Sequence, residues 1–331
     1  MNYQNPVWPG YFADPFVLAH RGEYYAYGTG ASLERDEAGA PRAFRILRSR
    51  DLVAWQAAGA ALAVPPENAD HAYWAPEVAE HEGRFYCYYS SAPAGHDELH
   101  RLRVAVADHP LGPFHEHGPV LPESEGFCID AHPFRDLRDG AWYLFFARDY
   151  FDERAGTGLA VVRLTRDLLR AAEPPRLVLR ANADWHIYER NRDLYGRRWA
   201  AWHTVEGPCV VAHRGRYYCF YSGGNWQTRD YGVSYAVADH PLGPWMHAPE
   251  SEPIVLREKS GEALGPGHNS YIVGPDGQTE FLVYHAWDPD RRARRMCIDR
   301  LVWTDAGPRC LGPTTGSQRT DQGRIPALAA D

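Results

Sequence analysis

Three carboxylic acids and one histidine occupy the same place in a local pattern that returns along this chain. Asp14, Asp130 and Glu206 each stand at the head of an apolar strand that leads into a hairpin of glycine and aromatic residues. Ala75 and His268 head two further copies. Carboxyl groups that share one pocket can take a proton from one reactant and give a proton to another. A radial repeat would bring the five heads to one axis, so the pattern predicts an acid–base site built from residues far apart in the sequence.

The repeat that would position these residues is clearest in two pairs of segments. Gly83-Arg-Phe-Tyr-Cys-Tyr-Tyr-Ser corresponds to Gly215-Arg-Tyr-Tyr-Cys-Phe-Tyr-Ser, and Val106-Ala-Asp-His-Pro-Leu-Gly-Pro-Phe corresponds to Val237-Ala-Asp-His-Pro-Leu-Gly-Pro-Trp. The copies are 132 and 131 residues apart, which is two units of about 66 residues each. The heads near 14, 75, 130, 206 and 268 are separated by 61, 55, 76 and 62 residues, so five units fill the chain.

Each unit reads as four short antiparallel strands. Alternating apolar residues and closely spaced turns favour strands, and long segments with the periodicity of a helix are missing from the sequence. We therefore predict an all-β fold, a five-bladed β-propeller with four antiparallel strands per blade, formed by residues 1–331 as one domain. A β-sandwich or β-helix is the competing fold, but neither explains chemically distinctive residues at the repeat period. The polar tail from about residue 314 is expected to be disordered.

Composition and charge narrow the class of partner. The chain has 20 Tyr, 12 Phe and 11 Trp among 331 residues and a net charge of -8 without a Lys/Arg block, which argues against nucleic acid or an anionic membrane surface as the main partner. The amino terminus does not read as a secretory signal, and no run of residues is long and apolar enough for a membrane span. The six cysteines form no CxxC pair, so we expect reduced, structural thiols and a cytoplasmic setting.

Five segments, in this order, resemble glycoside hydrolase family 43. They are Ala13-Asp-Pro-Phe-Val, Tyr73-Trp-Ala-Pro-Glu-Val, Ile129-Asp-Ala-His-Pro-Phe, Val205-Glu-Gly-Pro and Gly267-His-Asn-Ser. Each motif alone is weak, but five in order at the repeat spacing are specific, and the resemblance runs from about Pro6 to Pro313. The resemblance implies a five-bladed propeller that hydrolyses α-L-arabinofuranosides or β-D-xylosides with inversion of the anomeric centre.

The same resemblance assigns roles to the three acids. It implies that Asp14 is the general base, that Glu206 is the general acid, and that Asp130 orients Glu206. A negative charge on Asp130 would also hold the pKa of Glu206 high enough for it to stay protonated. Taken singly, Asp14 before a proline reads as a turn residue, Asp130 as a strand-end residue and Glu206 as a solvated turn acid. Their shared place in the repeat favours the catalytic interpretation.

Four further residues are candidates through the same resemblance. Trp74 would offer a flat apolar face to the sugar, although core packing is the usual role of a tryptophan. Arg300 would hydrogen-bond the sugar, and a surface salt bridge is its alternative. His268 would face the central channel and contact a calcium or other cation through water, or else serve as a hydrogen-bonded core histidine. His132 and Glu77 lie inside the motifs, where they would support the residues that contact substrate. The chemistry itself would require no cofactor.

These observations predict an exo-acting, inverting hydrolase that releases terminal α-L-arabinofuranose from short oligosaccharides. A β-D-xylosidase is the closest alternative, because the two sugars present similarly placed hydroxyls. From a different class, a carbohydrate-binding propeller without catalysis is disfavoured by the presence of all three acids. A protein-interaction propeller is disfavoured because repeated Trp-Asp dipeptides are missing. The predicted partner is a pentose-containing oligosaccharide, and the sequence predicts no oligomeric state.

Overall fold

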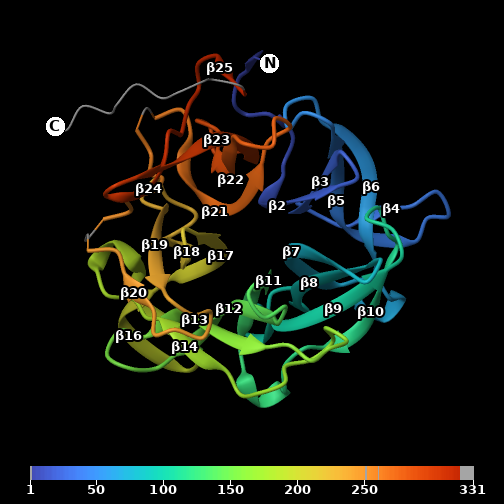
Figure 1. The fold of residues 1–331 in the computed structure, drawn as a ribbon. Coiled ribbons are helices and arrows are strands. Elements are labelled where there is room, and N and C mark those ends of the chain that lie inside the picture. Colours follow the sequence, from blue (N-terminus) through green and yellow to red (C-terminus); the bar gives the residue numbers. More distant parts are fainter. Residues whose placement is uncertain (1, 250–251, 260, 321–331) are drawn as a thin grey trace.

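The computed structural model describes residues 2–249, 252–259 and 261–320, and these are built from β-strands and short 3-10 helices. The strands form curled sheets that surround a central axis (Figure 1). The all-β class predicted from the sequence is therefore confirmed. The 3-10 helices lie in the connections and are η1 (Pro66–Asn68), η2 (Asp97–Leu99), η3 (Glu123–Glu125) and η4 (Asp184–His186).

The first sheet has nine strands and contains two groups that resemble each other. The groups are joined by a parallel pairing of β6 with β10, in which Leu62 faces Phe114. The first group comprises β2 (Ala13–His20), β3 (Glu23–Thr29), β4 (Glu34–Arg35), β5 (Pro41–Ser49) and β6 (Gln56–Ala63). The second group comprises β7 (His71–His81), β8 (Arg84–Pro93), β9 (Arg101–Ala107) and β10 (Phe114–Pro119).

The second sheet has six strands, because a hairpin is added to it. Its strands are β11 (Cys128–Arg135), β12 (Trp142–Tyr150), β13 (Gly156–Arg163), β14 (Arg176–Leu179), β15 (Ile187–Leu194) and β16 (Arg197–His203). The hairpin of β15 and β16 attaches where Gly156 pairs with His203. A Cβ atom on Gly156 would lie 2.0 Å from the carbonyl oxygen of His203, so this close approach requires glycine.

Two four-stranded sheets complete the ring of sheets around the central axis. One comprises β17 (Val205–His213), β18 (Arg216–Gly223), β19 (Gly232–Ala238) and β20 (Met246–His247). The other comprises β21 (Leu264–Val273), β22 (Glu280–Trp287), β23 (Arg294–Thr304) and β24 (Gly307–Cys310). A separate pair joins β1 (Asn2–Tyr3) to β25 (Gln318–Arg319), so the two ends of the described chain meet.

The strands β2, β7, β11, β17 and β21 form the inner ring, since each contacts two of the others. Each of them has the same irregularity, a shift in register beside a residue with left-handed backbone. These five residues are Asp14, Ala75, Asp130, Gly207 and His268, whose φ angles lie between 47° and 58°. The structure thus corrects one of the predicted heads: the equivalent residue of the fourth strand is Gly207, and Glu206 precedes it.

Large apolar side chains fill the space between successive groups of strands. Tyr27 of β3 and Tyr89 of β8 are fully buried in the cluster between the first two groups. The last and first groups of strands pack together in the same way, because Phe281 of β22 lies in one apolar cluster with Val17 of β2. Burial of this kind contributes roughly 25 cal/mol for each Å² of apolar surface, and it holds the inner ring in place.

Two predictions about organisation have different outcomes. Five blades stay a prediction, because hydrogen bonding joins the strands into sheets of nine, six, four, four and two strands. The prediction of disorder from residue 314 is wrong through residue 320: Thr314 bonds to Asp299, and β25 pairs with β1. Residues 321–331 of that tail lie outside the described residues.

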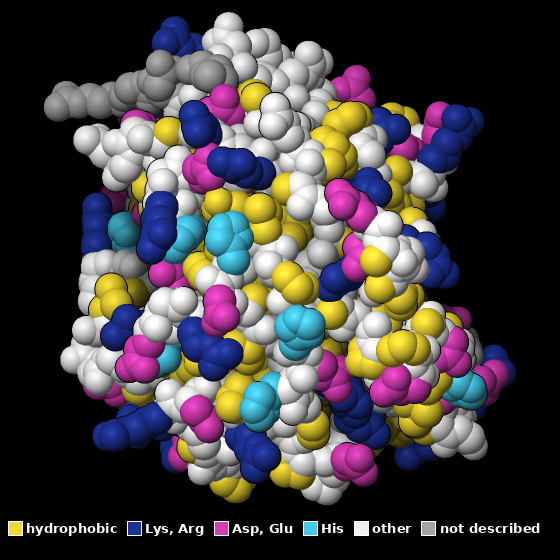
Figure 2. Space-filling model, turned by 90° about the vertical axis from the view of Figure 1, so that its right-hand side faces the viewer, with side chains coloured by type: hydrophobic (Ala, Val, Ile, Leu, Met, Phe, Trp, Pro, Cys, Tyr) yellow, Lys and Arg dark blue, Asp and Glu magenta, His cyan; other side chains and the backbone are white. Residues whose placement is uncertain are grey.

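The surface agrees with the charge pattern of the sequence. On the face in Figure 2, basic and acidic side chains are interspersed and neither sign gathers in a continuous patch. Among the described residues, no helix is long and apolar enough to cross a membrane. All six cysteines are buried and free of disulfides.

Candidate active site

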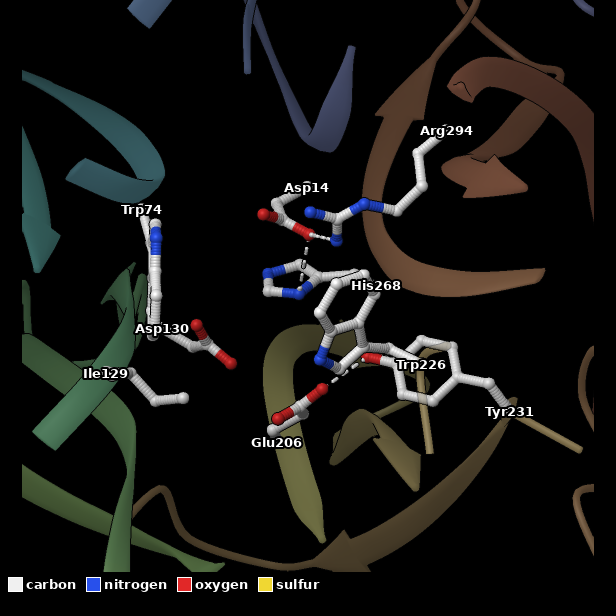
Figure 3. Close-up of a pocket in the computed structure, with 9 residues that line it drawn as sticks. All are labelled: Asp14, Trp74, Ile129, Asp130, Glu206, Trp226, Tyr231, His268 and Arg294. Atoms are coloured by element: carbon white, nitrogen blue, oxygen red, sulfur yellow. Dashed lines mark hydrogen bonds and ion pairs between the residues drawn. The ribbon is translucent and has the colours of Figure 1, made fainter. Parts of the chain in front are cut away.

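A pocket of about 210 Å³ opens at the inner ring, and we call it the central pocket. It contains the three predicted acids together with Trp74 and His268, all pointing toward one space in Figure 3. Its full lining is Asp14, Trp74, Ile129, Asp130, Glu206, Trp226, Tyr231, His268 and Arg294. The structure therefore brings together residues from five parts of the chain, as a radial repeat requires.

Asp14 is held as a carboxylate. Its Oδ1 lies 3.2 Å from Nη1 of Arg294, 3.4 Å from Nδ1 of His268 and 3.3 Å from Nδ1 of His285. Its amide N–H also donates to Nδ1 of His285 at 3.1 Å. Burial favours the neutral acid, but the charge of Arg294 outweighs it, so the pKa of Asp14 lies well below its usual range. Asp14 can therefore accept a proton at neutral pH.

Glu206 is held as an acid. It lies at the start of β17, and its Oε1 accepts a 2.7 Å hydrogen bond from the Tyr231 hydroxyl. Burial raises the pKa of Glu206 to about 7; the charge of Asp14 also raises it, whereas Tyr231 and Arg294 lower it. Near neutral pH, Glu206 is therefore protonated in a large share of molecules and able to donate that proton.

Asp130 links the acid to the neighbouring strand. Its Oδ2 accepts the amide N–H of Gly207 at 3.0 Å, which fixes the backbone beside Glu206. Burial raises the pKa of Asp130 well above its usual value, and the charges of Glu206 and Asp14 raise it further. Carboxylate oxygens of Asp130 and Glu206 lie within 4.8 Å of each other. Two carboxyl groups this close resist ionising together, so one proton is held between the two residues and they titrate as a pair.

A second group of buried side chains supports the three acids. His132 and Glu77 form a 2.7 Å hydrogen bond between β11 and β7, and Nε2 of His132 accepts the amide N–H of Val210 in β17 at 3.0 Å. Nδ1 of His132 therefore carries the proton that Glu77 accepts. These two residues do not line the central pocket but tie together three strands of the inner ring, which matches the supporting role expected from the sequence.

Aromatic rings form the walls of the central pocket. Trp74 stacks on His100 with ring centroids 3.6 Å apart, so one face of the indole is covered inside the protein. Trp226 is stacked on Trp287 at 5.9 Å and lies 4.4 Å from the guanidinium of Arg294. Flat apolar walls with a few convergent polar groups suit the faces and hydroxyls of a sugar ring.

The arginine of the central pocket is Arg294, and the structure does not bring Arg300 to it. Both lie on β23, but they are six positions apart, which is roughly 20 Å along an extended strand. Arg294 is at the end of β23 that reaches Asp14, whereas Arg300 is paired with Phe281 away from the pocket. Sequence reasoning also missed Tyr231, Trp226 and His285; none belongs to a repeat head, so the repeat carried no signal for them.

The cation predicted near His268 has an imperfect set of ligands. Ligand atoms of Asp130, Glu206 and His268 lie within 4.8 Å of one another. They supply two carboxyl groups and one ring nitrogen, whereas calcium takes six to eight oxygen ligands. A cation held there would also keep Glu206 ionised and unable to donate a proton. The three residues therefore do not fit a directly bound calcium, and the water-mediated contact of His268 stays a prediction.

A smaller cavity of about 150 Å³ adjoins the central pocket, and we call it the side cavity. The two share a wall made by Trp74, Ile129, Glu206 and Trp226. The rest of the side cavity comes from other elements. The hairpin of β15 and β16 is the largest contributor, with Tyr188, Arg192, Leu194, Tyr195 and Trp202. Glu206 thus stands at the junction of the two spaces.

This arrangement can perform one kind of chemistry well. An ionised carboxylate and a protonated carboxyl group line the same pocket, and Asp14 lies outside the cluster that Glu206 and Asp130 form with His268. A bond placed between them can be attacked by a water on the side of Asp14 while its departing oxygen takes a proton from Glu206. Such a division of acid and base roles is the requirement for glycosidic hydrolysis.

Comparisons with known proteins agree with this geometry. Residues 3–308 match the family described as glycosyl hydrolases family 43. A β-D-galactofuranosidase of Aspergillus niger is 29% identical over 92% of this chain and 83% of its own. An extracellular exo-α-(1→5)-L-arabinofuranosidase of Streptomyces chartreusis is 28% identical over 86% of this chain and 82% of its own. The crystal structure of a thermostable family-43 glycoside hydrolase superposes with a TM-score of 0.82 at 32% identity, covering 97% of this chain and all of the other.

Proposed function

Since the chain belongs to glycosyl hydrolases family 43, we propose that it is an inverting, exo-acting α-L-arabinofuranosidase that removes terminal arabinofuranose from short oligosaccharides. The observation that carries the mechanism is the opposite protonation of two acids in one pocket. The pKa of Asp14 is lowered by the charge of Arg294 against the effect of burial, and that of Glu206 is raised by burial to about 7. Pairs of acids whose environments separate their pKa values in this way divide the roles of base and acid.

In the proposed reaction, Asp14 removes a proton from a water molecule. The water oxygen attacks the anomeric carbon while the bond from that carbon to the glycosidic oxygen breaks, and Glu206 delivers its proton to the departing oxygen. Attack opposite to the leaving group inverts the anomeric centre in one step. Asp130 keeps Glu206 in place through the amide of Gly207, and one negative charge is conserved between Asp14 and Glu206.

The two cavities suggest where each part of the substrate lies. The sugar that is released would occupy the central pocket between Trp74 and Trp226, and the leaving oligosaccharide would occupy the side cavity beyond Glu206. Because the two spaces meet at Glu206, the glycosidic oxygen would lie beside the acid that protonates it. This arrangement matches an enzyme that cleaves one terminal sugar at a time.

The sugar preference rests on relatives. Several are named as arabinofuranosidases, which supports arabinofuranose as the released sugar. One relative, at 29% identity, is named a β-D-galactofuranosidase, and this sugar also has a five-membered ring, so β-D-galactofuranosides are a second candidate substrate. β-D-Xylosides remain the alternative expected from the sequence, since one structural neighbour is named a xylan β-1,4-xylosidase, although its 21% identity supports only the shared fold.

The test is a panel of nitrophenyl glycosides together with an NMR time course. We expect the highest kcat/KM on the α-L-arabinofuranoside, lower values on the β-D-galactofuranoside and β-D-xyloside, and first appearance of the inverted sugar. A higher kcat/KM on the β-D-galactofuranoside or the β-D-xyloside would mean that this sugar, and not arabinofuranose, is the one released. Retention of configuration would overturn the mechanism, and absence of hydrolysis with tight sugar binding would indicate a binding propeller.

Two further expectations complete the proposal. We assign one blade to each strand of the inner ring, which gives five, supported by the five apolar clusters between neighbouring groups of strands. We also propose a cytoplasmic setting, supported by six buried free cysteines, although three of the relatives are named extracellular. Fractionation of the producing cells tests the setting, and activity recovered from the medium of intact cells would contradict it.

A further inference from the structure

Tyr231 joins the acid to the rest of the pocket and has no part in the reaction described above. It precedes β19, its side chain is buried, and its hydroxyl lies 2.7 Å from Oε1 of Glu206. Its ring is parallel to that of His285, with centroids 6.0 Å apart, and His285 in turn holds the amide of Asp14. Tyr231 thus contacts both Glu206, the proposed acid, and His285, which supports the proposed base Asp14.

The hydrogen bond to Glu206 has a fixed direction. The amide N–H of His268 donates to Oγ of Ser222 at 2.8 Å, which leaves the Ser222 hydroxyl proton to donate elsewhere. The Ser222 side chain also hydrogen-bonds Tyr231. Because the Tyr231 oxygen accepts that proton, its own proton points to Oε1 of Glu206. Oε1 is therefore an acceptor, and the proton that Glu206 gives up must reside on Oε2.

The ring of Tyr231 is also held in a fixed position by close packing. A Cβ atom on Gly267 would lie 2.3 Å from the ring, so the ring occupies space that only glycine leaves free. The ring is 1% exposed, and burial raises the pKa of the phenol well above its usual value. The hydroxyl therefore remains a neutral donor whether Glu206 is protonated or ionised.

We propose that Tyr231 is a positioning residue for the general acid. It occupies Oε1 so that the acidic proton stands on Oε2, and it stabilises the carboxylate that forms as this proton leaves. The inference rests on the proposed role of Glu206 and adds the residue that sets its orientation and acid strength. Removing only the hydroxyl should leave a weaker, less well oriented acid.

Other groups that face Glu206 must be held constant in a test of pH dependence. They come from the strands packed around it: Asp14 from β2, Asp130 from β11, Tyr188 from β15, His268 from β21 and Arg294 from β23. Tyr231→Phe leaves all of these side chains unchanged. A shift of the pH profile in this variant therefore reports the lost hydroxyl.

The sign of the shift follows from the direction of the bond. A donor to the ionised form lowers the pKa of an acid, so its removal raises the pKa of Glu206. The alkaline limb of the pH profile for kcat/KM reports the loss of the acidic proton, so this limb should move to higher pH in Tyr231→Phe. On an oligosaccharide at neutral pH, kcat should fall roughly tenfold, the order expected for a hydrogen bond to a charged group.

The experiment compares Tyr231→Phe with Tyr217→Phe and Glu206→Ala on an oligosaccharide and on a dinitrophenyl glycoside. Tyr217 is a matched control, because it is also fully buried and donates to a carboxylate, Asp136, at 2.6 Å outside the pocket. We expect Tyr231→Phe to lose activity on the oligosaccharide far more than on the dinitrophenyl glycoside, whose leaving group needs little protonation. Tyr217→Phe should change neither the ratio of the activities on the two substrates nor the alkaline limb of the pH profile.

The outcomes separate this inference from the proposed function. An unmoved alkaline limb in Tyr231→Phe, while Glu206→Ala remains sensitive to the leaving group, overturns the role of Tyr231 alone. Equal losses on both substrates in Glu206→Ala overturn Glu206 as the acid, and this inference with it. If Tyr231→Phe fails to fold by thermal unfolding, Ser222→Ala carries the test, since it keeps the ring, weakens the donor and should move the limb in the same direction.

Discussion

The central pocket and the side cavity share a wall but are held in place in different ways. In the central pocket, Asp14 is fixed by Arg294, Asp130 by the amide of Gly207 and Glu206 by Tyr231. Asp14 and Asp130 are buried, and Glu206 is partly buried. In the side cavity, most groups outside the shared wall stand on the hairpin of β15 and β16 and on the short 3-10 helix η2. Tyr195 there is 42% exposed.

This difference separates chemistry from recognition. Buried groups with several fixed partners keep the protonation states that catalysis needs, and one substitution among them changes the pKa values of the others. Exposed groups on an added hairpin can change between related proteins without disturbing the acids, as is usual for binding loops on a rigid scaffold. The comparison predicts large effects on turnover in the central pocket and modest effects on binding in the side cavity.

The largest expected effect comes from removing an acid. Asp14→Ala and Glu206→Ala should each lower kcat on an unactivated oligosaccharide by about 100- to 10,000-fold, because each loses a proton transfer made in the transition state. Steady-state kinetics measures the loss, and thermal unfolding checks that the fold persists. A folded variant that works at nearly the rate of the parent would remove its residue from the mechanism.

Arg294 tests how the base is kept ionised. In Arg294→Gln, the pKa of Asp14 should rise, because a positive charge that opposes the effect of burial is lost. Asp14 must be ionised to accept a proton, so the acidic limb of the pH profile should move to higher pH. Arg300→Gln is the matched control on the same strand and should leave the limb in place. If the acidic limb moves only in Arg300→Gln, Arg300 and not Arg294 is the arginine of the active site, as the sequence predicted.

The contrast between these arginines shows what the sequence could predict. The three acids, Trp74 and His268 were found because each belongs to a motif at the repeat period, and the repeat translates directly into nearness at the axis. Arg294 belongs to a third strand, where nothing local tells which arginine lies at the pocket end. Tyr231 lies in a connection, and its contact with Glu206 depends on the glycine at 267 and on packing across two sheets. Such contacts follow from tertiary structure and leave no period in the sequence.

Asp130 tests the pairing of the two acids. In Asp130→Asn, the proton that the pair shares has one carboxyl group fewer to hold it, so this last proton should leave at lower pH and the alkaline limb should move downward. The rate should also fall, since the amide of Gly207 loses a charged acceptor. A pH–rate profile measures both effects. An alkaline limb that stays fixed would show that Asp130 does not influence the proton of the acid.

The side cavity should respond through binding. Tyr195→Ala is expected to raise KM for an oligosaccharide about tenfold, which corresponds to about 1.4 kcal/mol, and to leave KM for a small aryl glycoside nearly unchanged. Phe151→Ala is the control, because Phe151 packs against Tyr195 and Trp202 but does not line the cavity. A fall in kcat on both substrates would mean that the hairpin supports the acids and that the two regions are not separate.

The smallest effect is expected from removal of divalent cations. The central pocket reduces its negative charge within the protein, since Arg294 neutralises Asp14 and a shared proton neutralises one of Asp130 and Glu206. A cation among Asp130, Glu206 and His268 would displace that proton and disable the acid. Dialysis against EDTA should therefore leave kcat unchanged, and added zinc, which accepts imidazole and carboxylate ligands, should inhibit more strongly as pH rises. A loss of turnover on dialysis that added calcium restores would contradict this prediction and would show that a cation takes part in the central pocket.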